Sequence, residues 1–437
     1  MIKSRLLAAG VLASALAAVP VVIAVGSERA GPSASDLSLI VGVMNLVQKG
    51  YVHPVEADEL TKDALKGMLS RLDPHSDYMD EQEFRQSQAD IAGKFGGLGI
   101  QISQQAGIPK VISPIDGTPA ARAGIQPGDL IISINRESTH GMDLEKVVAL
   151  LRGKPGTSVD LTISRGTQPP FDVKLTRSII QVQTVNSRLA ENGVGYVRVS
   201  EFGGDTPKEF RHALDDLKRQ SGGKLKGLVL DLRNDPGGLL AAAVDVSSAF
   251  LDGGAVVSVR GRSRGDNRTY NAPTNGDILR GTPIVVLING ASASASEIVA
   301  GALQDRHRAT VIGTQSFGKG SVQTLIPLNG HGALRLTTAL YYTPAGRSIQ
   351  GEGIVPEIVV EAAKDEQVEG AVMTRESGLY GAFTNPGPMG KQRSKRKAEP
   401  PTTDRTSYSA PIKAELIGTP HDAQLNAAFS RFDAAGG

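Results

Sequence analysis

Hydrophobic and polar positions along this chain follow two periods, which together predict a mixed α/β protein. Short apolar runs indicate buried strands at residues 194–199, 228–232 and 284–288. Apolar positions at helical spacing predict a helix over residues 239–251, between two of these strands. Because strands alternate with helices, we expect α/β layers in a domain at residues 181–363.

Residues 36–91 have the helical period instead. Apolar positions within residues 39–47 and 60–69 form two amphipathic stretches, and a polar turn at 72–78 ends them. This pattern predicts an N-terminal helical segment whose apolar faces pack against neighbouring structure.

Residues 92–180 read as a separate small module. They begin with a glycine-rich turn and continue with a Thr118-Pro119 helix start. An amphipathic helix is expected at residues 144–151, followed by an alternating strand at 159–163.

The extreme N-terminus has the features of an export signal. Lys3 and Arg5 precede an apolar stretch at residues 6–25. Residues 1–30 therefore fit either a cleaved signal peptide or an uncleaved membrane anchor. We expect a periplasmic or otherwise extracytoplasmic protein, held at the inner membrane if the stretch is retained.

Composition narrows the chemistry further. The 437 residues suffice for two or three domains, and with 4% aromatic residues and no tryptophan the cores must be aliphatic. A formal net charge of +2 gives no case for nucleic-acid binding, and the absence of cysteine excludes a thiol nucleophile and disulfides. No metal-binding spacing is present, so we expect no metal and no cofactor. We interpret residues 364–437, with a basic run at 391–397, as a partly disordered tail with a short helix at 422–432.

Ser294 lies between a predicted strand and a predicted helix. At a helix start, free backbone N–H groups and the positive end of the helix dipole suit an oxyanion. Glu297 follows three residues later, so helix capping also accounts for Ser294. Serine becomes a nucleophile only when a neighbouring base takes its proton.

Lys319, in a Phe-Gly-Lys-Gly loop, offers that base. An apolar pocket lowers the pKa of a lysine because it disfavours the ammonium, and the flanking glycines permit a sharp bend. Gln323 can hydrogen-bond the lysine, although a solvated loop explains both residues equally simply. His307 lies at the far end of the predicted Ser294 helix, which argues against a Ser-His-Asp triad.

The order Ser-Ala-Ser-Glu, Phe-Gly-Lys-Gly and a glutamine four residues after the lysine resembles the active-site region of the carboxy-terminal processing peptidases, also called tail-specific proteases. The resemblance covers residues 38–360. It implies a crotonase-like or ClpP-like catalytic core in which Ser294 is the nucleophile, Lys319 the general base and Gln323 the residue that orients Lys319.

The Leu-Arg-Asn-Asp-Pro-Gly-Gly element at residues 232–238 extends this resemblance. It implies an oxyanion hole formed by the N–H of Ala295 with that of Gly237 or Gly238. The resemblance also implies that N-terminal helices assemble oligomers, and local packing explains those helices equally well.

The order of elements in residues 92–180 resembles a PDZ domain, inserted before the catalytic core. Such domains add a peptide as an extra strand and bind its terminal carboxylate in a loop of backbone N–H groups. The resemblance assigns that loop to Gly97, Leu98, Gly99 and Ile100. Arg152, at the end of the predicted helix, either couples peptide binding to assembly of the catalytic site or interacts with the helix dipole.

These observations predict an extracytoplasmic serine endopeptidase that recognises C-terminal tails through a PDZ domain and cuts with a Ser/Lys dyad. A catalytically inactive PDZ scaffold or adaptor and a crotonase-like acyl-CoA enzyme are the alternatives. The expected partners are proteins or peptides with apolar C-termini, a membrane contacted through the N-terminus, further copies joined through N- or C-terminal helices, and an adaptor protein.

Overall fold

The computed structural model describes residues 31–368, 374–389 and 411–433, except for residues 92, 106, 116, 182 and 191. The chain forms two compact units that divide after Asp63. The predicted export signal lies outside the described residues. Within them, no helix combines the length and hydropathy needed to cross a bilayer.

The first unit contains α1 (Ala34–Gly50) and the start of α2 (Ala57–Leu69). A capping box begins α1, because the Ser33 hydroxyl accepts the N–H of Asp36 at 3.1 Å and the Asp36 carboxylate accepts the N–H of Ser33 at 2.8 Å. No residue of α1 is buried, so its leucines are exposed to solvent.

The second unit contains the rest of the chain. It includes a strand and a helix that precede the small module, β1 (Asp77–Met79) and α3 (Glu81–Ile91). The module itself comprises β2 (Lys94–Gly97), β3 (Ile100–Gln105), β4 (Ile108–Pro114), α4 (Pro119–Arg122), β5 (Leu130–Ile134), β6 (Glu137–Ser138), α5 (Leu144–Leu151), β7 (Ser158–Ser164), β8 (Phe171–Thr176) and β9 (Ser178–Gln181).

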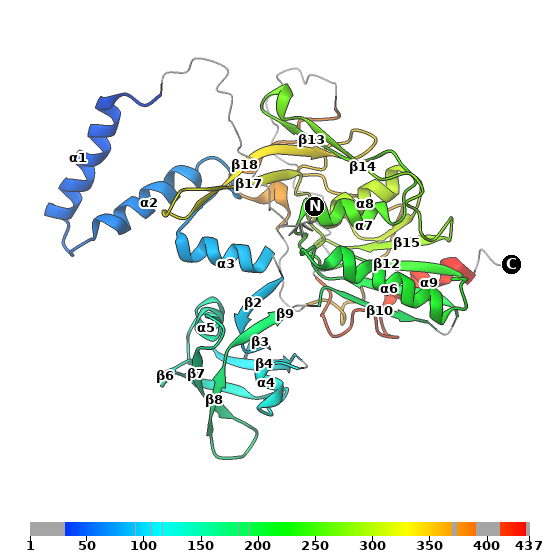
Figure 1. Cartoon of the computed structure of the whole chain (residues 1–437), viewed down its shortest axis with the longest axis horizontal. Coiled ribbons are helices and arrows are strands. Elements are labelled where there is room, and N and C mark those ends of the chain that lie inside the picture. The colour runs from blue at the N-terminus through cyan, green and yellow to red at the C-terminus, as the bar shows by residue number, and fades with distance from the viewer. Residues whose placement is uncertain are drawn as a thin grey trace, which may run out of the picture. The chain divides into compact units, whose positions relative to one another are not determined.

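The module has its own sheet and its own aliphatic core. Its strands have the order β3-β4-β5-β7-β8, with β6 paired to β5, and β2 and β9 form a separate two-stranded ribbon. As Figure 1 shows, this ribbon joins the module to the rest of the unit. The core includes Val111, Ile131, Val147, Leu161 and Ile163, each essentially inaccessible to solvent.

A six-stranded sheet forms the centre of the α/β domain expected at residues 181–363, with the order β10-β11-β12-β15-β16-β19. All its neighbours run parallel except β10 and β11. Its strands are β10 (Val185–Leu189), β11 (Val194–Val199), β12 (Gly227–Asp231), β15 (Ile284–Ile288), β16 (Thr310–Gly313) and β19 (Ile358–Val359).

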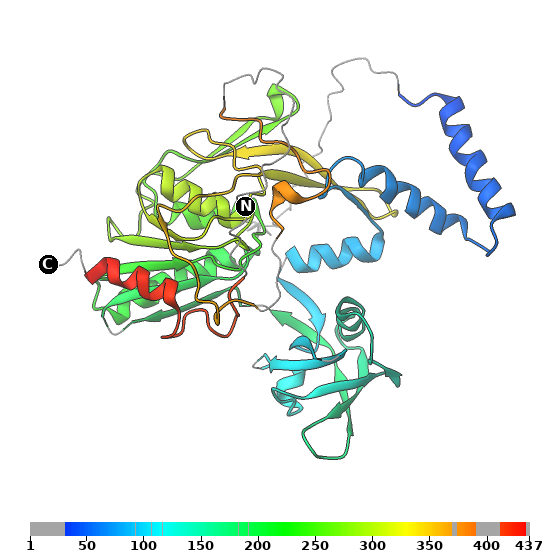
Figure 2. The same ribbon diagram turned by 180° about the vertical axis from the view of Figure 1, so that it is seen from behind.

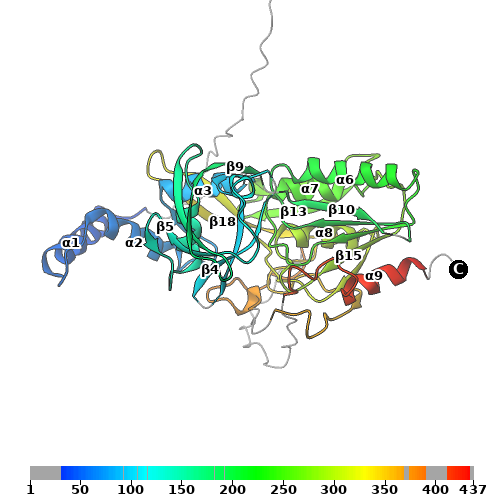
Figure 3. The same ribbon diagram turned by 90° about the horizontal axis from the view of Figure 1, so that it is seen from below.

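Helices cover both faces of this sheet, as the near-continuous apolar strands require. Alternate residues point to opposite faces: Leu228 packs with α6 (Thr206–Gln220), α7 (Leu240–Ser248) and α8 (Ala295–Asp305), whereas Val229 packs with α9 (Ala423–Asp433). Figure 3 shows α6 and α7 on one side of the strands and α9 on the other. The predicted α/β layers are therefore present.

A second, antiparallel sheet has the order β1-β18-β13-β14, and β17 pairs with β18 beside this path. Its other elements are β13 (Ala255–Gly261), the 3-10 turn η1 (Arg264–Asp266), β14 (Arg268–Asn271), β17 (Ser321–Pro327) and β18 (Ala333–Tyr342).

The C-terminal part of the chain differs from the predicted tail. A short 3-10 turn, η2 (Glu376–Gly378), follows the α/β domain expected at residues 181–363. Residues 411–433 then begin with a β-bridge between Gln367 and Ile412 and end in α9. Figure 2 shows α9, in red, lying over the strands of the central sheet. A domain boundary at residue 364 would therefore cut off residues 411–433, which pack against the core of the same domain. The basic run at 391–397 lies outside the described residues.

Candidate active site

Ser294 occupies the turn between β15 and α8, as the sequence pattern predicts. Its backbone has φ +56° and ψ −110°, a strained conformation for a residue with a side chain. Neighbouring contacts hold the turn: the N–H of Ala293 donates to the carbonyl of Asp235 at 3.0 Å, and the Ser292 hydroxyl donates to the carbonyl of Leu232 at 2.8 Å. The serine is thus fixed on a sharp strand-to-helix turn, a backbone geometry that also exposes nucleophilic serines in hydrolases.

Glu297 links the Ser294 turn to the Lys319 loop. One of its carboxylate oxygens accepts the N–H of Ser294 at 2.8 Å and the N–H of Lys319 at 2.9 Å. The other oxygen accepts the N–H of Gly318 at 2.7 Å and the hydroxyl of Ser316 at 2.6 Å. A single buried side chain therefore joins two segments that are more than twenty residues apart in the sequence.

Glu297 is fully buried and forms no ion pair among the described residues. Burial raises its pKa to about 7, although the four donated hydrogen bonds lower it. From the sequence pattern, Glu297 is expected only to complete a capping box with Ser294. Its contacts with the lysine loop depend on the tertiary fold, so local sequence gave no signal for them.

The Lys319 side chain is half-buried, and the residue lies in the segment between β16 and β17. Burial lowers its pKa, which the charges of Glu376, Glu297 and Asp73 partly offset. The electrostatic surroundings thus favour a lysine that loses its proton more readily than usual. Among the described residues, no hydrogen bond joins Ser294 Oγ to Lys319 Nζ, so the dyad stays a prediction.

Gln323 has partners other than the expected one. Its side-chain amide donates to the Ser321 hydroxyl at 3.0 Å and to the Thr337 hydroxyl at 3.2 Å. Thr337 in turn donates to Asp73 at 3.0 Å. The structure therefore connects Gln323 to β18 and to the turn before β1, whereas the sequence interpretation connected it to Lys319.

Two further groups support the lysine loop. Tyr341 is buried, and its hydroxyl donates to the carbonyl of Lys319. Burial raises the pKa of Tyr341, and hydrogen bonding to the neighbouring Ser294 side chain lowers it only in part. On the other side, the Gln350 amide accepts the N–H of Gly320 at 2.9 Å and donates to Glu376 at 2.9 Å. Neither partner could be assigned from sequence spacing.

The Pro-Gly-Gly turn lies directly against the nucleophile. A Cβ atom on Gly237 would come within 2.8 Å of both the Ala295 nitrogen and the Ser294 Cβ, so only glycine fits there. The N–H of Gly237 donates to the Asp235 carboxyl group at 2.8 Å. In contrast, the N–H groups of Gly238 and Ala295 donate to no acceptor among the described residues. The sequence left Gly237 and Gly238 open as donors to the oxyanion hole. Of the two, Gly238 has the N–H that is available for this role.

Arg233 holds in place the segment that precedes the Pro-Gly-Gly turn. It is fully buried and contacts Asp231 at 2.9 Å and Asp422 at 2.6 and 2.7 Å. Burial lowers the pKa of Arg233, but these two carboxylates raise it well above its usual value. The Asn234 amide also donates to the carbonyl of Ile412 at 2.6 Å. The C-terminal segment thus anchors the turn that carries Gly237 and Gly238.

The small module places its predicted peptide-binding loop at an exposed sheet edge. The loop of Gly97, Leu98, Gly99 and Ile100 leads into β3, which pairs only with β4 among the described strands. Gly99 has φ +75°, and any Cβ there would collide with Thr118 at 2.3 Å. Leu98 is buried with Leu151 of α5 in the module core. The edge of β3 is therefore open to an additional strand.

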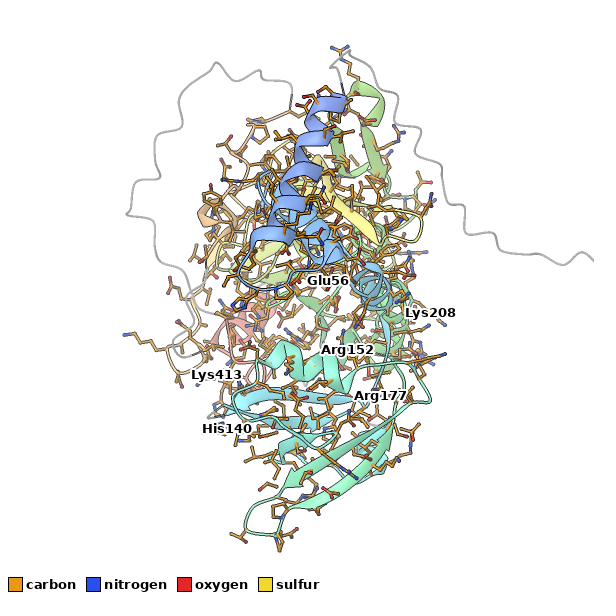
Figure 4. All side chains as sticks on the ribbon, turned by 90° about the vertical axis from the view of Figure 1, so that its left-hand side faces the viewer. Glu56, His140, Arg152, Arg177, Lys208 and Lys413 are labelled. Atoms are coloured by element: carbon orange, nitrogen blue, oxygen red, sulfur yellow. The ribbon has the colours of Figure 1, made fainter. Side chains whose placement is uncertain are left out.

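Arg152 follows α5, as Figure 4 shows together with Arg177. Its guanidinium carbon lies 4.3 Å from the ring centre of Phe95 in β2. Arg177 donates to the carbonyls of Leu150 and Leu151 at 2.7 and 3.0 Å and so stabilises the C-terminal end of α5. Arg152 therefore contacts the ribbon of β2 and β9, whereas Arg177 binds the C-terminal end of α5.

Comparison with known proteins gives a consistent set of relatives. The chain matches the profiles of Peptidase family S41 over residues 193–360, of the PDZ domain over 110–165 and of the activating protease CtpB N-terminal domain over 22–83. It is 49% identical over 355 residues, 80% of each chain, to the carboxy-terminal-processing protease of Bartonella bacilliformis. It is 34% identical over 337 residues, 77% of this chain and 71% of the relative, to the carboxy-terminal processing protease CtpA of Bacillus subtilis.

Among solved structures, the photosystem II D1 C-terminal processing protease is 28% identical to this chain. The match covers 75% of this chain and 94% of that protein, with a TM-score of 0.46.

Proposed function

Because this chain belongs to the carboxy-terminal processing proteases of peptidase family S41, we propose that it cuts protein tails with a Ser294/Lys319 dyad after capturing them through its PDZ domain. Its class as a serine-type endopeptidase with a PDZ domain and a mixed α/β fold, predicted from the sequence, is confirmed by the family matches. The catalytic residues, the mode of tail capture and the cellular location are the parts that we propose.

In the proposed reaction, Ser294 Oγ attacks the carbonyl carbon of the scissile peptide bond while the neutral Lys319 amine takes the hydroxyl proton. The resulting lysine ammonium then protonates the leaving amine. The N–H groups of Ala295 and Gly238 would donate to the oxyanion of the tetrahedral intermediate. Water, activated by Lys319 in the same way, then hydrolyses the acyl-enzyme.

The observation that supports this proposal best is the double contact of Glu297. One carboxylate oxygen accepts the backbone N–H groups of both Ser294 and Lys319, so the two residues are held at one point of the structure. The lowered pKa of Lys319, caused by burial, supports the same assignment because a general base must be neutral.

Substitution of each proposed residue tests the dyad. Ser294→Ala and Lys319→Ala should each reduce kcat on an unstructured protein with an apolar C-terminus by at least about a thousandfold, while circular dichroism stays unchanged. Lys208→Ala, which removes an exposed lysine on α6, serves as the matched control and should cut normally. If either dyad variant cuts at the control rate, the proposed dyad is wrong and a binding scaffold becomes the better reading.

Tail capture is proposed for the loop at Gly97, Leu98, Gly99 and Ile100 together with the open edge of β3. Backbone N–H groups of such a loop bind a free carboxylate, so amidation of the substrate C-terminus should raise KM and leave kcat nearly unchanged. Equal KM values for the free and amidated substrates would contradict carboxylate recognition. Arg152, in contact with Phe95, is proposed to communicate capture to the catalytic domain through β2 and β9.

We also propose an extracytoplasmic location, based on Lys3, Arg5 and the apolar stretch at residues 6–25. Cell fractionation of the full chain tests this location, and N-terminal sequencing distinguishes a cleaved signal from a membrane anchor. Assembly through the terminal helices and an adaptor protein remain predictions, which analytical ultracentrifugation and co-purification would address.

A further inference from the structure

Asp235 contacts both turns that supply the proposed oxyanion hole. Its side-chain Oδ1 accepts the N–H of Gly237 at 2.8 Å, on the Pro-Gly-Gly turn. Its main-chain carbonyl accepts the N–H of Ala293 at 3.0 Å and the hydroxyl of Ser296 at 3.0 Å, on the turn that carries Ser294. A single residue therefore joins the two turns whose N–H groups would bind the oxyanion.

The contact with Oδ1 fixes the direction of the Gly237 N–H. The carbonyl of Gly237 is also bound, because it accepts the N–H of Phe202 at 2.8 Å. Gly238, with φ +141°, lies against the same Phe202, since a Cβ on Gly238 would come within 2.3 Å of the Phe202 carbonyl oxygen. With Gly237 held on both of its backbone groups, the N–H of Gly238 is left without an acceptor among the described residues.

The Asp235 carboxyl group is fully buried, and its second oxygen, Oδ2, has no hydrogen-bond partner among the described residues. Burial raises the pKa of this carboxyl group well above its usual value, and the N–H of Gly237 and the hydroxyl of Ser296 lower it only in part. The charges of Arg198 and Glu201 act on it in opposite directions. Because a buried anion with an unpaired oxygen costs far more than a neutral carboxyl group in the same place, the surroundings favour a protonated Asp235.

We propose that Asp235 is a positioning residue, which as a neutral carboxyl group binds the N–H of Gly237 and so leaves that of Gly238 to donate to the oxyanion. Through its main-chain carbonyl it also keeps this donor in place relative to the N–H of Ala295. The inference rests on the proposed function, since the oxyanion forms only when Ser294 attacks. Asp235 acts through the glycine turn, so its loss should weaken binding of the transition state more than binding of the substrate.

A peptide aldehyde tests this role with the full-length chain, because the nucleophile hydroxyl adds to it and places its oxygen in the oxyanion hole. The alcohol of the same peptide forms no such adduct and measures binding of the peptide alone. In Asp235→Ala the inhibition constant of the aldehyde should rise about a hundredfold, and that of the alcohol should change less than about twofold. kcat should fall by a similar factor, with KM nearly unchanged. Asp245→Ala, which removes an exposed carboxyl group from α7, is the matched control and should leave both constants at their wild-type values.

Two further variants separate the acceptor from the shape and charge of the side chain. Asp235→Leu fills the same space without a polar atom, so it leaves no cavity and should behave like Asp235→Ala. Asp235→Asn keeps an oxygen that accepts the Gly237 N–H and carries no charge, so aldehyde inhibition and kcat should stay within about threefold of the wild type. A loss of about tenfold or more in Asp235→Asn would overturn the neutral form proposed for Asp235.

The outcomes distinguish this inference from the proposed nucleophile. If Ser294→Ala binds the aldehyde as tightly as the wild type does, the nucleophile is wrong, and the role of Asp235 fails with it. If Ser294→Ala loses the advantage of the aldehyde over the alcohol and Asp235→Leu retains it, only the role of Asp235 is wrong. Equal losses for the aldehyde and the alcohol in Asp235→Ala and Asp235→Leu would also overturn it, because they would show a general loosening of the site.

Discussion

The Ser294 side of the site and the Pro-Gly-Gly side are each fixed by a fully buried charged residue, and the two residues are satisfied in different ways. Glu297 accepts hydrogen bonds from three backbone N–H groups and one hydroxyl, and it forms no ion pair among its described contacts. Arg233, on the other side, lies between the carboxylates of Asp231 and Asp422. One residue is held by dipoles and the other by opposite charges.

The partners of each buried carboxyl group set the direction in which its pKa is shifted. The pKa of Glu297 is raised to about 7 by burial, so its charge changes near neutrality. For Asp231, burial raises the pKa, but the charge of Arg233 more than offsets this and lowers it overall. On the same side of the site, burial raises the pKa of Asp235, which accepts the N–H of Gly237, well above its usual value. Both sides therefore contain a buried carboxyl group whose pKa is raised, and the ion pair with Arg233 lowers the pKa of Asp231 alone.

The largest effect should come from breaking the charged cluster. Asp422→Ala leaves the buried guanidinium of Arg233 with one carboxylate and with Gln424 as its remaining side-chain partner in the C-terminal segment, so unfolding should become easier by about 3–5 kcal/mol. Urea denaturation measures this loss. Asp277→Ala, which breaks the less buried pair with Arg308, is the control and should cost about 1 kcal/mol. Equal losses in the two variants would show that burial does not distinguish them.

Glu297 should make stability depend on pH in the opposite sense to a typical paired carboxylate. Its folded pKa of about 7 lies above the usual 4.5, so its stabilising contribution is complete below pH 4.5 and is lost as pH rises through 7. The loss amounts to about 3 kcal/mol. Between pH 4.5 and 8, the free energy of unfolding of the wild type should fall relative to that of Glu297→Gln, which has no carboxyl group at this position. Parallel curves would show that Glu297 does not titrate in this range.

Replacing Glu297 should also lower kcat, and the corresponding free energy should be smaller than the change in the free energy of unfolding. In Glu297→Gln the side-chain NH2 replaces one oxygen that accepts backbone N–H groups, so the Ser294 turn and the Lys319 loop lose their common partner. We expect kcat to fall about tenfold to a hundredfold with little change in KM. Glu357→Gln is a matched control, because Glu357 also accepts a backbone N–H, from Val311 at 2.7 Å, but is exposed. A normal kcat for Glu297→Gln would exclude a positioning role.

The same comparison explains which parts of the molecule were predictable from sequence. The strand before Ser294 and the helix after it follow from local apolar periodicity, and the structure places α8 at Ala295–Asp305 around the expected residues. The motif left Gly237 and Gly238 open as donors to the oxyanion hole, and the choice of Gly238 required the hydrogen bond from the N–H of Gly237 to Asp235. Local patterns thus located the elements, and three-dimensional contacts decided the roles.

Contacts between distant segments were not predictable. Asp422 lies 189 residues from Arg233, and its own sequence surroundings resemble an ordinary helix start. The interpretation of residues 364–437 as a tail followed from the basic run and the polar composition, which carry no information about packing of α9 against the sheet. Likewise, the capping-box pattern identified Glu297 but could not show that Lys319 shares it.

The smallest expected effect concerns Gln323 and decides between the sequence interpretation and the structure. Since its amide donates to Ser321 and Thr337, Gln323→Ala should cost about 1 kcal/mol of stability and reduce kcat less than tenfold. Thr337→Val removes one of the same hydrogen bonds from the other side, so the double variant should lose less than the sum of the two single losses. The pH above which kcat/KM rises should stay at its wild-type value in Gln323→Ala, because burial is what lowers the pKa of Lys319. A shift of that pH would mean that Gln323 acts on Lys319 during catalysis, as the sequence pattern alone suggested, and that the amide exchanges its partners when substrate binds.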